Sequence, residues 1–366
     1  MMREGWEYKK LGEICSSELG KTLNKSKDKG VLHPYICAIN ILWDKIDLTT
    51  LKETNFKEDE IERYTVKYGD LLVCEGGDTG RAAIWDRKES ILYQNALHRL
   101  RFSEGVDARF VLYNLWYKKR IGEIDHKYSK GVTILHLVKS ALLSIPILIP
   151  PKSTQLAIVS ELDKINELIR LKKEQLKDFD NLAQSLFYEM FGDPVENEMG
   201  WEVKKLGEVY KMKSGDSLST KSFEEGDIPV YGGNGISGYH NQYNKDGSYI
   251  IIGRVGVYCG NVRIVKGRFW LTDNAFELLY DNSSQNEVFV CSLLTHLNLR
   301  QYANAAAQPV ISNNTLKHVS IPLPPLPLQH LFAHRIEQIE QQKAEVQKAI
   351  TDLETLLASR MQYWFE

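Results

Sequence analysis

The stretch GWEYKKLGEI at residues 5–14 recurs as GWEVKKLGEV at residues 200–209, with eight of ten letters the same. Trp6 and Leu11, with their counterparts Trp201 and Leu206, are the residue types that pack a core. This repeated sequence motif, which we call the repeated phrase, recurs at a distance of 195 positions and predicts that the chain contains the same structural unit twice. We therefore expect the phrase to mark the entry of each unit.

The correspondence continues through both halves. Gly69–Val73, followed by a glycine cluster that ends at Gly80, corresponds to Gly247–Ile251, followed by a cluster that ends at Gly260. QNA at 94–96 corresponds to DNA at 273–275. SIPILIPPKSTQ at 144–155 corresponds to SIPLPPLPLQ at 320–329, which is two residues shorter. From Gln155 and Gln329 the halves run without a gap, 174 positions apart, to Phe191 and Phe365. Each half is thus a globular part followed by one long segment.

The long segments are predicted to be helices. Apolar residues recur at spacings of three and four, and neither segment contains an interrupting Gly or Pro. We expect the two helices to pack on each other and to serve as spacer and subunit-docking elements through Leu162, Ile165, Ile169, Leu176, Phe179, Ile336, Ile339, Val346, Ile350, Leu353 and Leu357.

Prolines precede both helices, at positions 146, 150 and 151 and again at 322, 324, 325 and 327. Because proline fixes its φ angle and lacks an N–H, these residues are expected to end strand structure and form stiff elbows where each helix begins. A proline-rich ligand motif is the alternative reading of the second cluster, but its occurrence at both junctions favours the structural role.

The globular parts are predicted to be mixed α/β. DLLVCE, RAAIW, SYIII and NVRIV are short apolar runs typical of strands around glycine-bearing loops, and 109–124 and 288–302 have helical spacing. If the second helix packs on the first, it must return antiparallel. The chain would then be a pseudo-two-fold dumbbell with its termini close together, an arrangement suited to a ligand with two separated sites, such as duplex DNA.

The composition restricts the class of protein to which the chain can belong. The chain has 366 residues, five scattered cysteines and a formal net charge of −2. Because the cysteines are odd in number and none lies in a C-x-x-C pair, we expect free thiols in a reducing cytoplasm. The lack of a long apolar run predicts a soluble protein without a membrane segment. Positive charge gathers in residues 1–151 (+3) and 200–328 (+1), whereas 152–199 (−4) and 329–366 (−2) are acidic.

Taken in order, these motifs resemble the specificity subunits of type I restriction-modification systems. The resemblance covers essentially the whole chain and includes YGDLLVCEGGDTGRAAIW, YGGNGISGYHNQY, IIIGRVGVYCGNV, WLTDNAFEL and AQPVISNNTLKHVSIPLPPLPLQ. It implies two target recognition domains, at 1–151 and 200–328, separated by a coiled-coil spacer of long antiparallel helices at 152–199 (with a linker) and 329–366.

The resemblance also implies the partners. Each recognition domain would read half of a bipartite, asymmetric site on double-stranded DNA, and the helices would set the spacing and dock two methyltransferase subunits. Those subunits would modify adenine with S-adenosylmethionine, and restriction subunits would cut unmodified DNA. The chain itself would be a non-catalytic reader without a cofactor or metal.

The sequence motifs also predict that the chain is not catalytic by itself. The [N/D/S]-P-P-[Y/F/W] motif that holds a flipped adenine is absent, since only IPPK and LPPL occur. LGKT at 19–22 lacks the first glycine of a phosphate-binding loop, where Cys15 stands. The nine histidines show no metal-ligand spacing, and Asp70, Glu75 and Asp78 favour turn roles over a nuclease cluster.

DNA contacts are expected from the glycine-rich loops, where the backbone can approach a duplex closely. Base-reading candidates are Thr79 and Arg81 in the first half and Asn234, Ser237, Tyr239, His240 and Arg254 in the second; phosphate candidates are Lys21, Lys25, Arg87 and Lys213. Low net charge predicts weak DNA binding by the isolated chain. The competing interpretation is a coiled-coil scaffold whose globular ends bind proteins, which explains the helices but not why a shared frame carries divergent loops.

Overall fold

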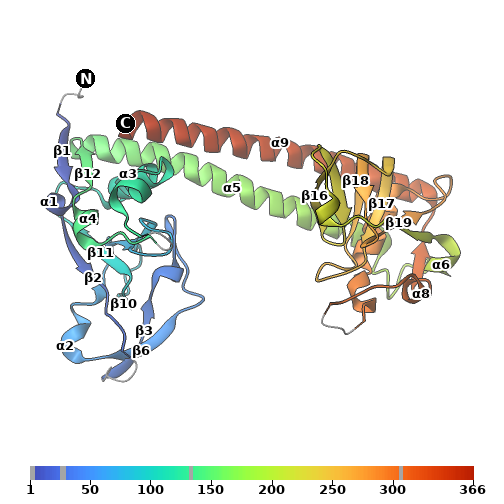
Figure 1. The fold of residues 1–366 in the computed structure, drawn as a ribbon, viewed down its shortest axis with the longest axis horizontal. Coiled ribbons are helices and arrows are strands. Elements are labelled where there is room, and N and C mark those ends of the chain that lie inside the picture. The colour runs from blue at the N-terminus through green and yellow to red at the C-terminus, as the bar shows by residue number, and fades with distance from the viewer. Residues whose placement is uncertain (1–4, 25–29, 132–134, 305–307) are drawn as a thin grey trace. The chain divides into compact units, whose positions relative to one another are not determined.

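The computed structural model describes residues 5–24, 30–131, 135–304 and 308–366, and the chain divides into two compact units (Figure 1). Unit 1 comprises residues 1–172 and 349–366, and unit 2 comprises residues 173–348. The predicted mixed α/β class is confirmed, because each unit combines helices with small sheets. No helix among the described residues is both long enough and apolar enough to cross a membrane.

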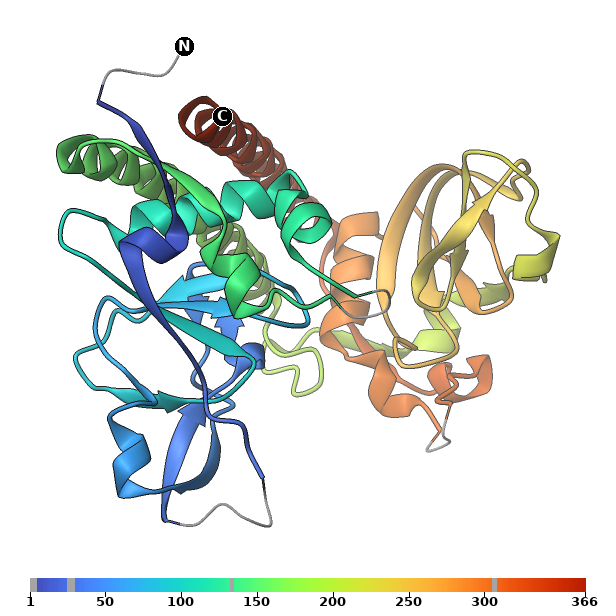
Figure 2. The ribbon, with the colours of Figure 1, turned by 60° about the vertical axis from the view of Figure 1, so that its left-hand side comes forward.

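Unit 1 holds two four-stranded sheets, ordered β6-β3-β10-β7 and β2-β11-β8-β9, and the pairs β1-β12 and β4-β5. Figure 2 shows these strands with α3 above them. The elements are β1 (Glu7–Lys10), α1 (Leu11–Ile14), β2 (Cys15–Leu19), β3 (Val31–Ile36), η1 (Ala38–Asn40), β4 (Ile41–Leu42), β5 (Lys45–Ile46), β6 (Lys52–Phe56), α2 (Glu58–Ile61), β7 (Thr65–Val66), β8 (Leu71–Cys74), β9 (Ala82–Ile84), β10 (Ile91–Tyr93), β11 (Leu97–Phe102), α3 (Ala108–Arg120), η2 (Ile124–Tyr128), α4 (Lys139–Leu143), β12 (Pro146–Ile149) and α5 (Lys152–Phe191).

Unit 2 is built on one six-stranded sheet, ordered β14-β19-β17-β18-β15-β16, with the pair β13-β20 beside it. The elements are β13 (Glu202–Lys205), α6 (Leu206–Val209), β14 (Lys211–Ser214), η3 (Thr220–Ser222), β15 (Ile228–Gly232), β16 (Gly235–His240), β17 (Lys245–Gly253), β18 (Val262–Leu271), β19 (Ala275–Leu279), α7 (Glu287–His296), η4 (Leu299–Tyr302), α8 (Asn313–Leu316), β20 (Ser320–Leu323) and α9 (Leu326–Phe365).

The repeated phrase has the same local structure in both units. Trp6 in unit 1 is buried and stacks on Trp364, whereas in unit 2 the indole of Trp201 donates a hydrogen bond to the carbonyl of Phe191. Leu11 and Leu206 are completely buried, as predicted for core residues. The backbone N–H groups of Lys10 and Lys205 donate to Glu13 and Glu208, which closes the first turn of each short helix.

Both long helices have 40 residues, and their bounds lie 174 positions apart. In unit 1, Glu161 on α5 is paired with Arg360 on α9, and in unit 2 Asp180 on α5 is paired with Lys343 on α9 at 2.8 Å. In each unit α5 and α9 run antiparallel, as predicted. At 1.5 Å per residue, each helix is about 60 Å long.

The helix ends belong to the cores of the units. Phe187 and Phe191 of α5 pack with Phe332 of α9 and Phe289 of α7 inside unit 2. In unit 1, Phe365 packs against Phe110 of α3 at 5.5 Å between ring centroids. A domain boundary drawn where a helix begins therefore separates residues that share one core.

The proline prediction is partly wrong. Pro146 lies within β12 and Pro322 within β20, so neither ends a strand. Both strands are paired on one side only, where the missing proline N–H costs little. The second helix begins at Leu326, earlier than expected, and Pro327 occupies its first turn, where an N–H has no helical partner in any case.

The predicted match of SIP at 144–146 with SIP at 320–322 is also wrong. Lys10 pairs with Pro146 in one unit, and its counterpart Lys205 pairs with Ser320 in the other. Likewise Leu11 bonds to Ile145, and Leu206 bonds to Val319. The spatial correspondence is therefore 174 positions throughout this segment, and the two SIP letter runs are displaced by two residues.

Candidate nucleic-acid interface

One loop is held by the same backbone hydrogen bonds in both units. The N–H of Gly80 donates to the carbonyl of Cys74 in unit 1, and the N–H of Gly260 donates to Gly253 in unit 2, at 2.9 and 2.7 Å. The segments that precede α4 and α8 add another equivalent pair, because Leu137 N–H donates to the carbonyl of Glu75 and Ile311 N–H donates to the carbonyl of Arg254. The loops 75–80 and 254–260 are therefore counterparts on a shared frame.

The side chains on these loops differ. The first loop reads EGGDTG and the second reads RVGVYCG, so Glu75 occupies the position of Arg254. In the second loop Val257 is 62% exposed and Tyr258 is 50% exposed. A common frame that carries different exposed side chains is suited to two different half-sites.

In unit 2 a hairpin tip lies directly against this loop. A Cβ on Gly233 would come within 2.4 Å of the carbonyl oxygen of Val255, and a Cβ on Gly253 would come within 2.3 Å of the carbonyl oxygen of Gly233. Only glycine permits this backbone contact. It brings the turn between β15 and β16, with exposed Asn234, beside Arg254 and Tyr258. We call the exposed side chains Asn234, Val257 and Tyr258 the unit 2 edge.

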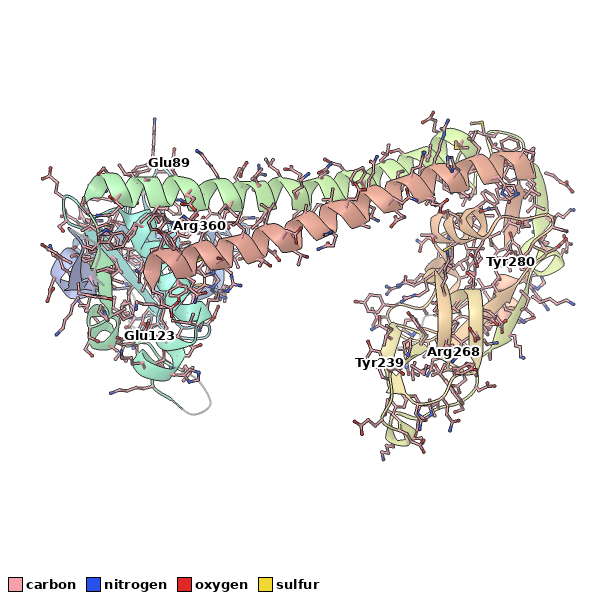
Figure 3. All side chains as sticks on the ribbon, turned by 90° about the horizontal axis from the view of Figure 1, so that it is seen from above. Glu89, Glu123, Tyr239, Arg268, Tyr280 and Arg360 are labelled. Carbon is pink, nitrogen blue, oxygen red and sulfur yellow. The ribbon has the colours of Figure 1, made fainter. Side chains whose placement is uncertain are left out.

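The other residues predicted on this hairpin divide by exposure. Tyr239 and Ser237 are exposed, and Tyr239 points outward in Figure 3. His240 is buried, and its Nδ1 accepts a hydrogen bond from the N–H of Glu224 at 3.0 Å. A DNA contact through His240 would require this buried ring to move, whereas Tyr239 is available as it stands.

Arg254 is half-buried and loosely held. Its Nη1 donates to the Ser214 hydroxyl and to the Asp273 carbonyl, both at 3.4 Å, and its guanidinium lies 5.3 Å from the centre of the Phe276 ring. Its buried Nε has no hydrogen-bond partner among the described residues. A guanidinium with unused donors at a loop edge is suited to an acceptor such as a base or a phosphate.

The two predicted residues of unit 1 are engaged within the protein. The hydroxyl of Thr79, which is 1% exposed, donates to Asp125 at 2.9 Å, and Arg81 donates through Nη2 to the carbonyl of Ala38 at 3.0 Å. Burial raises the pKa of Asp125, but hydrogen bonds from Lys119 and Thr79 outweigh it and hold the pKa below its usual value. These contacts fix the loop to η1 and η2. Nearby, Ile39 is exposed, whereas Asp78 is half-buried and paired with Lys119 at 2.9 Å.

The phosphate candidates lie in different settings. Arg87 and Lys213 are exposed, whereas Lys21 is 4% exposed and donates to the Glu60 carboxylate at 2.7 Å. Lys25 lies outside the described residues. A DNA contact by any of the predicted residues remains a prediction.

The helix residues predicted from their spacing face inward. Leu162, Ile165, Ile169, Ile339, Val346, Ile350 and Leu357 are at most 7% exposed. Leu176, Phe179, Ile336 and Leu353 are half-buried. Their burial explains the spacing as core packing, and docking through these side chains remains a prediction.

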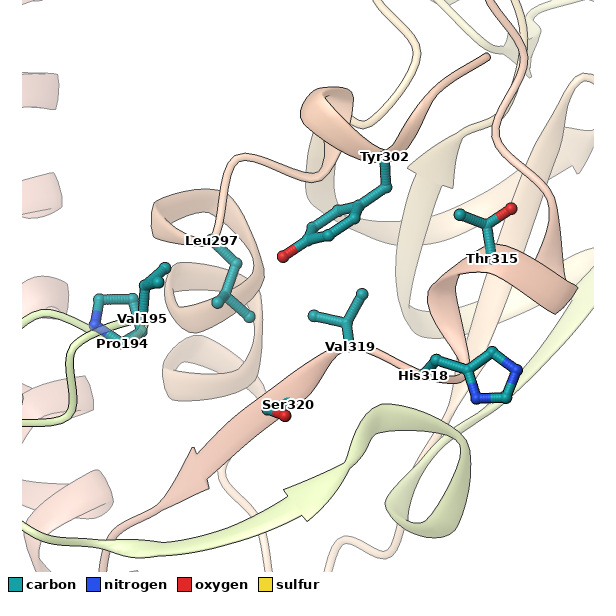
Figure 4. A pocket seen from close by; sticks show the side chains of 8 residues that line it. All are labelled: Pro194, Val195, Leu297, Tyr302, Thr315, His318, Val319 and Ser320. Carbon is teal, nitrogen blue, oxygen red and sulfur yellow. The ribbon is translucent and has the colours of Figure 1, made fainter.

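A cavity of about 440 Å³ lies in unit 2, and its lining includes Tyr302, Thr315, His318 and Ser320 (Figure 4). It is lined mainly by apolar residues, among them Val195, Leu297 and Val319, with His318 at one side. No carboxylate or cysteine is among its lining residues. Across the described residues, no cluster of His, Cys, Asp and Glu could hold a metal ion.

The chain is similar to known DNA specificity proteins. The family model described as "Type I restriction modification DNA specificity domain" matches residues 3–178 and 198–355. The EcoprrI specificity subunit of Escherichia coli, a type I restriction enzyme, is 34% identical over 150 residues, which cover 40% of this chain and 37% of that relative. The chain thus matches little more than a third of that relative's length.

Two further matches extend over nearly the whole chain. The type I restriction enzyme MjaVIII specificity subunit of Methanocaldococcus jannaschii is 22% identical, over 97% of this chain and 92% of that relative. The crystal structure of the S subunit of a type I restriction-modification system from M. genitalium has the same fold, with a TM-score of 0.60 and 18% identity over 99% of this chain and 96% of that one.

Proposed function

We propose that this chain, which belongs to the family of type I restriction-modification DNA specificity subunits, reads two half-sites of one asymmetric sequence on double-stranded DNA. The observation that carries the proposal is the loop frame common to both units. Equivalent backbone hydrogen bonds hold loops 75–80 and 254–260, yet the side chains presented there differ. Two readers with one backbone plan and different exposed residues would recognise different bases.

The proposed division assigns the readers to residues 1–151 and 200–328 and the spacer to 152–199 and 329–366. Helices of 40 residues support a spacing role, because each supplies about 60 Å of stiff length, compared with about 34 Å for one turn of DNA. A spacer of constant length would restrict the number of base pairs between the half-sites.

The proposed partners are two methyltransferase subunits that transfer a methyl group from S-adenosylmethionine to adenine N6, joined by restriction subunits. The chain would act in the cytoplasm as the non-catalytic reader of this complex. The formal charge of −2 supports a division of labour, since the chain alone can neutralise few phosphates. The base-reading candidates remain Thr79, Arg81, Asn234, Ser237, Tyr239, His240 and Arg254, and the unit 2 edge adds Val257 and Tyr258.

Co-expression with the methyltransferase, followed by methylation-sensitive sequencing, tests this function. We expect one bipartite motif to be methylated, and we expect a chimera with residues 1–151 from another specificity subunit to change only one half of it. Methylation or cleavage by the isolated chain would contradict the proposal. A complex that forms but modifies no DNA would favour the scaffold interpretation.

A further inference from the structure

A second cavity in unit 2 is lined by cations and neutral polar residues. It measures about 310 Å³, and its lining includes Arg263 of β18 and Arg300 of η4, together with Asn261, Thr295 and Asn298. No carboxylate is among its lining residues. Guanidinium, amide and hydroxyl groups all donate hydrogen bonds, so this cavity is suited to an anion. We call it the arginine pocket.

Neither arginine of this pocket is paired within the part of the chain that the structure describes. Arg300 is exposed and Arg263 is half-buried, and neither guanidinium makes an ion pair or a hydrogen bond with a described residue. By contrast, Arg268 on the same strand lies 3.2 Å from Asp246. Arg268 is labelled in Figure 3. The arginine pocket therefore carries two positive charges that no described carboxylate compensates.

Close backbone contacts place the arginine pocket beside the unit 2 edge. A Cβ on Gly235, which follows Asn234, would come within 2.6 Å of Nη1 of Arg263. A Cβ on Gly260, which ends the second loop, would come within 2.5 Å of the backbone nitrogen of Arg300. Each arginine thus lies against one of the two elements that form the edge. Because phosphates border the groove in which bases are read, a duplex held at the edge would bring phosphates to the pocket.

The corresponding place in unit 1 has cations of its own. Arg81 is the counterpart of Asn261, because their carbonyls accept equivalent hydrogen bonds from the strand before each loop, at 2.8 and 2.9 Å. Lys119 is the counterpart of Asn298, because each lies twelve residues after the residue that caps α3 or α7. Positive charge thus occurs at this place in both units, but on different residues.

In unit 1 two carboxylates neutralise these cations. Lys119 is paired with Asp78 at 2.9 Å and with Asp125 at 2.7 Å, and Arg81 lies 3.8 Å from Asp78. The equivalent elements of unit 2 lack such acids, since neither loop 254–260 nor η4 contains an aspartate or a glutamate. The same place is therefore closed by internal ion pairs in unit 1 and left positive in unit 2.

Stabilisation of a helix end is the alternative explanation for the two arginines. The helix α7 ends at His296, and cations are favourable near the negative end of a helix. An arginine in this role would donate to the last carbonyls of the helix. The carbonyls of Leu293 and Thr295 instead accept from the N–H groups of Leu297 and Asn298. The absence of such a bond from either arginine to a described residue favours an external anion as the partner.

We infer that the arginine pocket binds a phosphate group of the DNA backbone, next to the half-site that unit 2 reads. The inference rests on the proposed function and adds to it a contact that does not depend on sequence. Arg263 and Arg300 would bind the phosphate oxygens, because a planar guanidinium matches a phosphate through two parallel hydrogen bonds. The side-chain amides of Asn261 and Asn298 would supply further donors. Unit 1 would hold DNA without this contact.

Anisotropy titrations of the full methyltransferase complex, at several salt concentrations and with a cognate and an unrelated duplex, test the inference. We expect R263Q/R300Q to weaken binding about tenfold on both duplexes. The slope of log K against log salt should become shallower by about 1, the change for the loss of one phosphate contact. The methylated motif should stay the same, because no base contact is removed.

N298D tests the same electrostatics without removing an arginine. It gives the pocket an acid of the kind that closes this place in unit 1, and the φ of 47° at Asn298 is one that aspartate also adopts. We expect the same weakening on both duplexes and the same change of slope. R268Q is the matched control, since this arginine of β18 is 60% exposed and already paired with Asp246, and it should leave the slope unchanged. Circular dichroism checks that each variant is folded.

The outcomes separate the inference from the function on which it rests. Unchanged affinity and slope in folded R263Q/R300Q and N298D would overturn the inference and leave the proposed function standing. Weakening confined to the cognate duplex would also overturn it, because it would assign the arginines to bases. Calorimetric binding of inorganic phosphate that R263Q/R300Q abolishes, with DNA binding unchanged, would overturn it in favour of a free anion. A wild-type complex that does not distinguish the two duplexes would overturn the proposed function, while the slopes would still decide the phosphate contact.

Discussion

Gln155 and Gln329 make two equivalent hydrogen bonds in the two units. The Gln155 side chain accepts from the N–H of Asp107 at 2.8 Å and donates to the carbonyl of Pro150 at 2.9 Å. Gln329 accepts from Asn286 N–H at 2.9 Å and donates to Pro324 at 2.8 Å. Each glutamine thus ties the first turn of a long helix to the capping residue of α3 or α7.

Replacing either glutamine should destabilise its unit. Gln155 and Gln329 are 0% and 1% exposed, so alanine would leave a buried N–H and a buried carbonyl without partners. We expect Q155A and Q329A each to lower the free energy of unfolding by about 2–3 kcal/mol. Denaturant titration measures the loss. The exposed glutamine of α5 supplies the control, since Q184A should stay within about 0.5 kcal/mol of the wild type.

Removal of Trp6 should destabilise unit 1. The indole is 8% exposed and stacks on Trp364 with 6.5 Å between ring centroids, so it holds the end of α9 in this unit. We expect W6A to cost about 3–5 kcal/mol, as for other large-to-small core changes. Y8A, two residues away at a position 61% exposed, should change stability by less than about 0.5 kcal/mol. Equal losses in W6A and Y8A would show that the stack does not stabilise the unit.

Truncating the unit 2 edge should reduce discrimination between DNA sequences. In the methyltransferase complex, we expect N234A and Y258A each to weaken binding to the cognate site by about 1–3 kcal/mol, the range for one base contact, while binding to unrelated DNA is unchanged. Fluorescence anisotropy with both DNAs at one salt concentration measures this difference. N282A, an exposed asparagine elsewhere in unit 2, is the control. Equal weakening on both DNAs would assign these residues to phosphate contacts.

Acid should destabilise unit 1 through His98. Burial lowers the pKa of this imidazole below its usual value of 6.5, because the ring is 0% exposed and its Nδ1 has no partner among the described residues. The unfolded chain then binds the extra proton more readily, so the stability due to His98 is complete above about pH 6.5 and declines as the pH falls below it. We expect H98Q to lose less stability than the wild type between pH 7 and pH 5, as measured by thermal unfolding. Parallel losses would exclude His98 as the cause.

His296 predicts a similar response in unit 2. Burial lowers the pKa of this histidine, which stacks on Phe187 with 4.0 Å between ring centroids. H296Q should therefore also reduce the loss of stability on acidification from pH 7 to pH 5. The exposed His334 of α9 is the control, since H334Q should leave the pH dependence unchanged.

Much of the fold was predictable because periodic patterns report local structure directly. The spacing of Ile165 and Ile169 predicted a helix with one buried face, and the glycine clusters predicted loops between strands. Alignment of identical residues in the two halves was wrong where the halves share a backbone pairing but not the side chains. Pro146 and Ser320 share no chemistry, yet both pair with the last lysine of the opening strand.

Candidate contacts were the least predictable part, because exposure depends on neighbours distant in sequence. The sequence predicts that Thr79 lies in a loop and contacts DNA, but its side chain is buried and bonded to Asp125, 46 positions away in the sequence. Tyr258 is not among the residues predicted from the sequence, although its position between Gly256 and Gly260 is typical of a loop whose backbone approaches another closely. Its exposure became visible only when the glycine contacts at 233 and 253 placed the loop beside the hairpin.

By itself, the sequence determined that one unit occurs twice, that each is mixed α/β and that each leads into one long helix, because repeats and periodicity are properties of the chain's order. Only the tertiary structure decided which residues of those elements are available. Burial placed Leu162 and Leu357 inside and left Leu182 and Leu356 at the surface, since the face a side chain presents depends on what packs beside it.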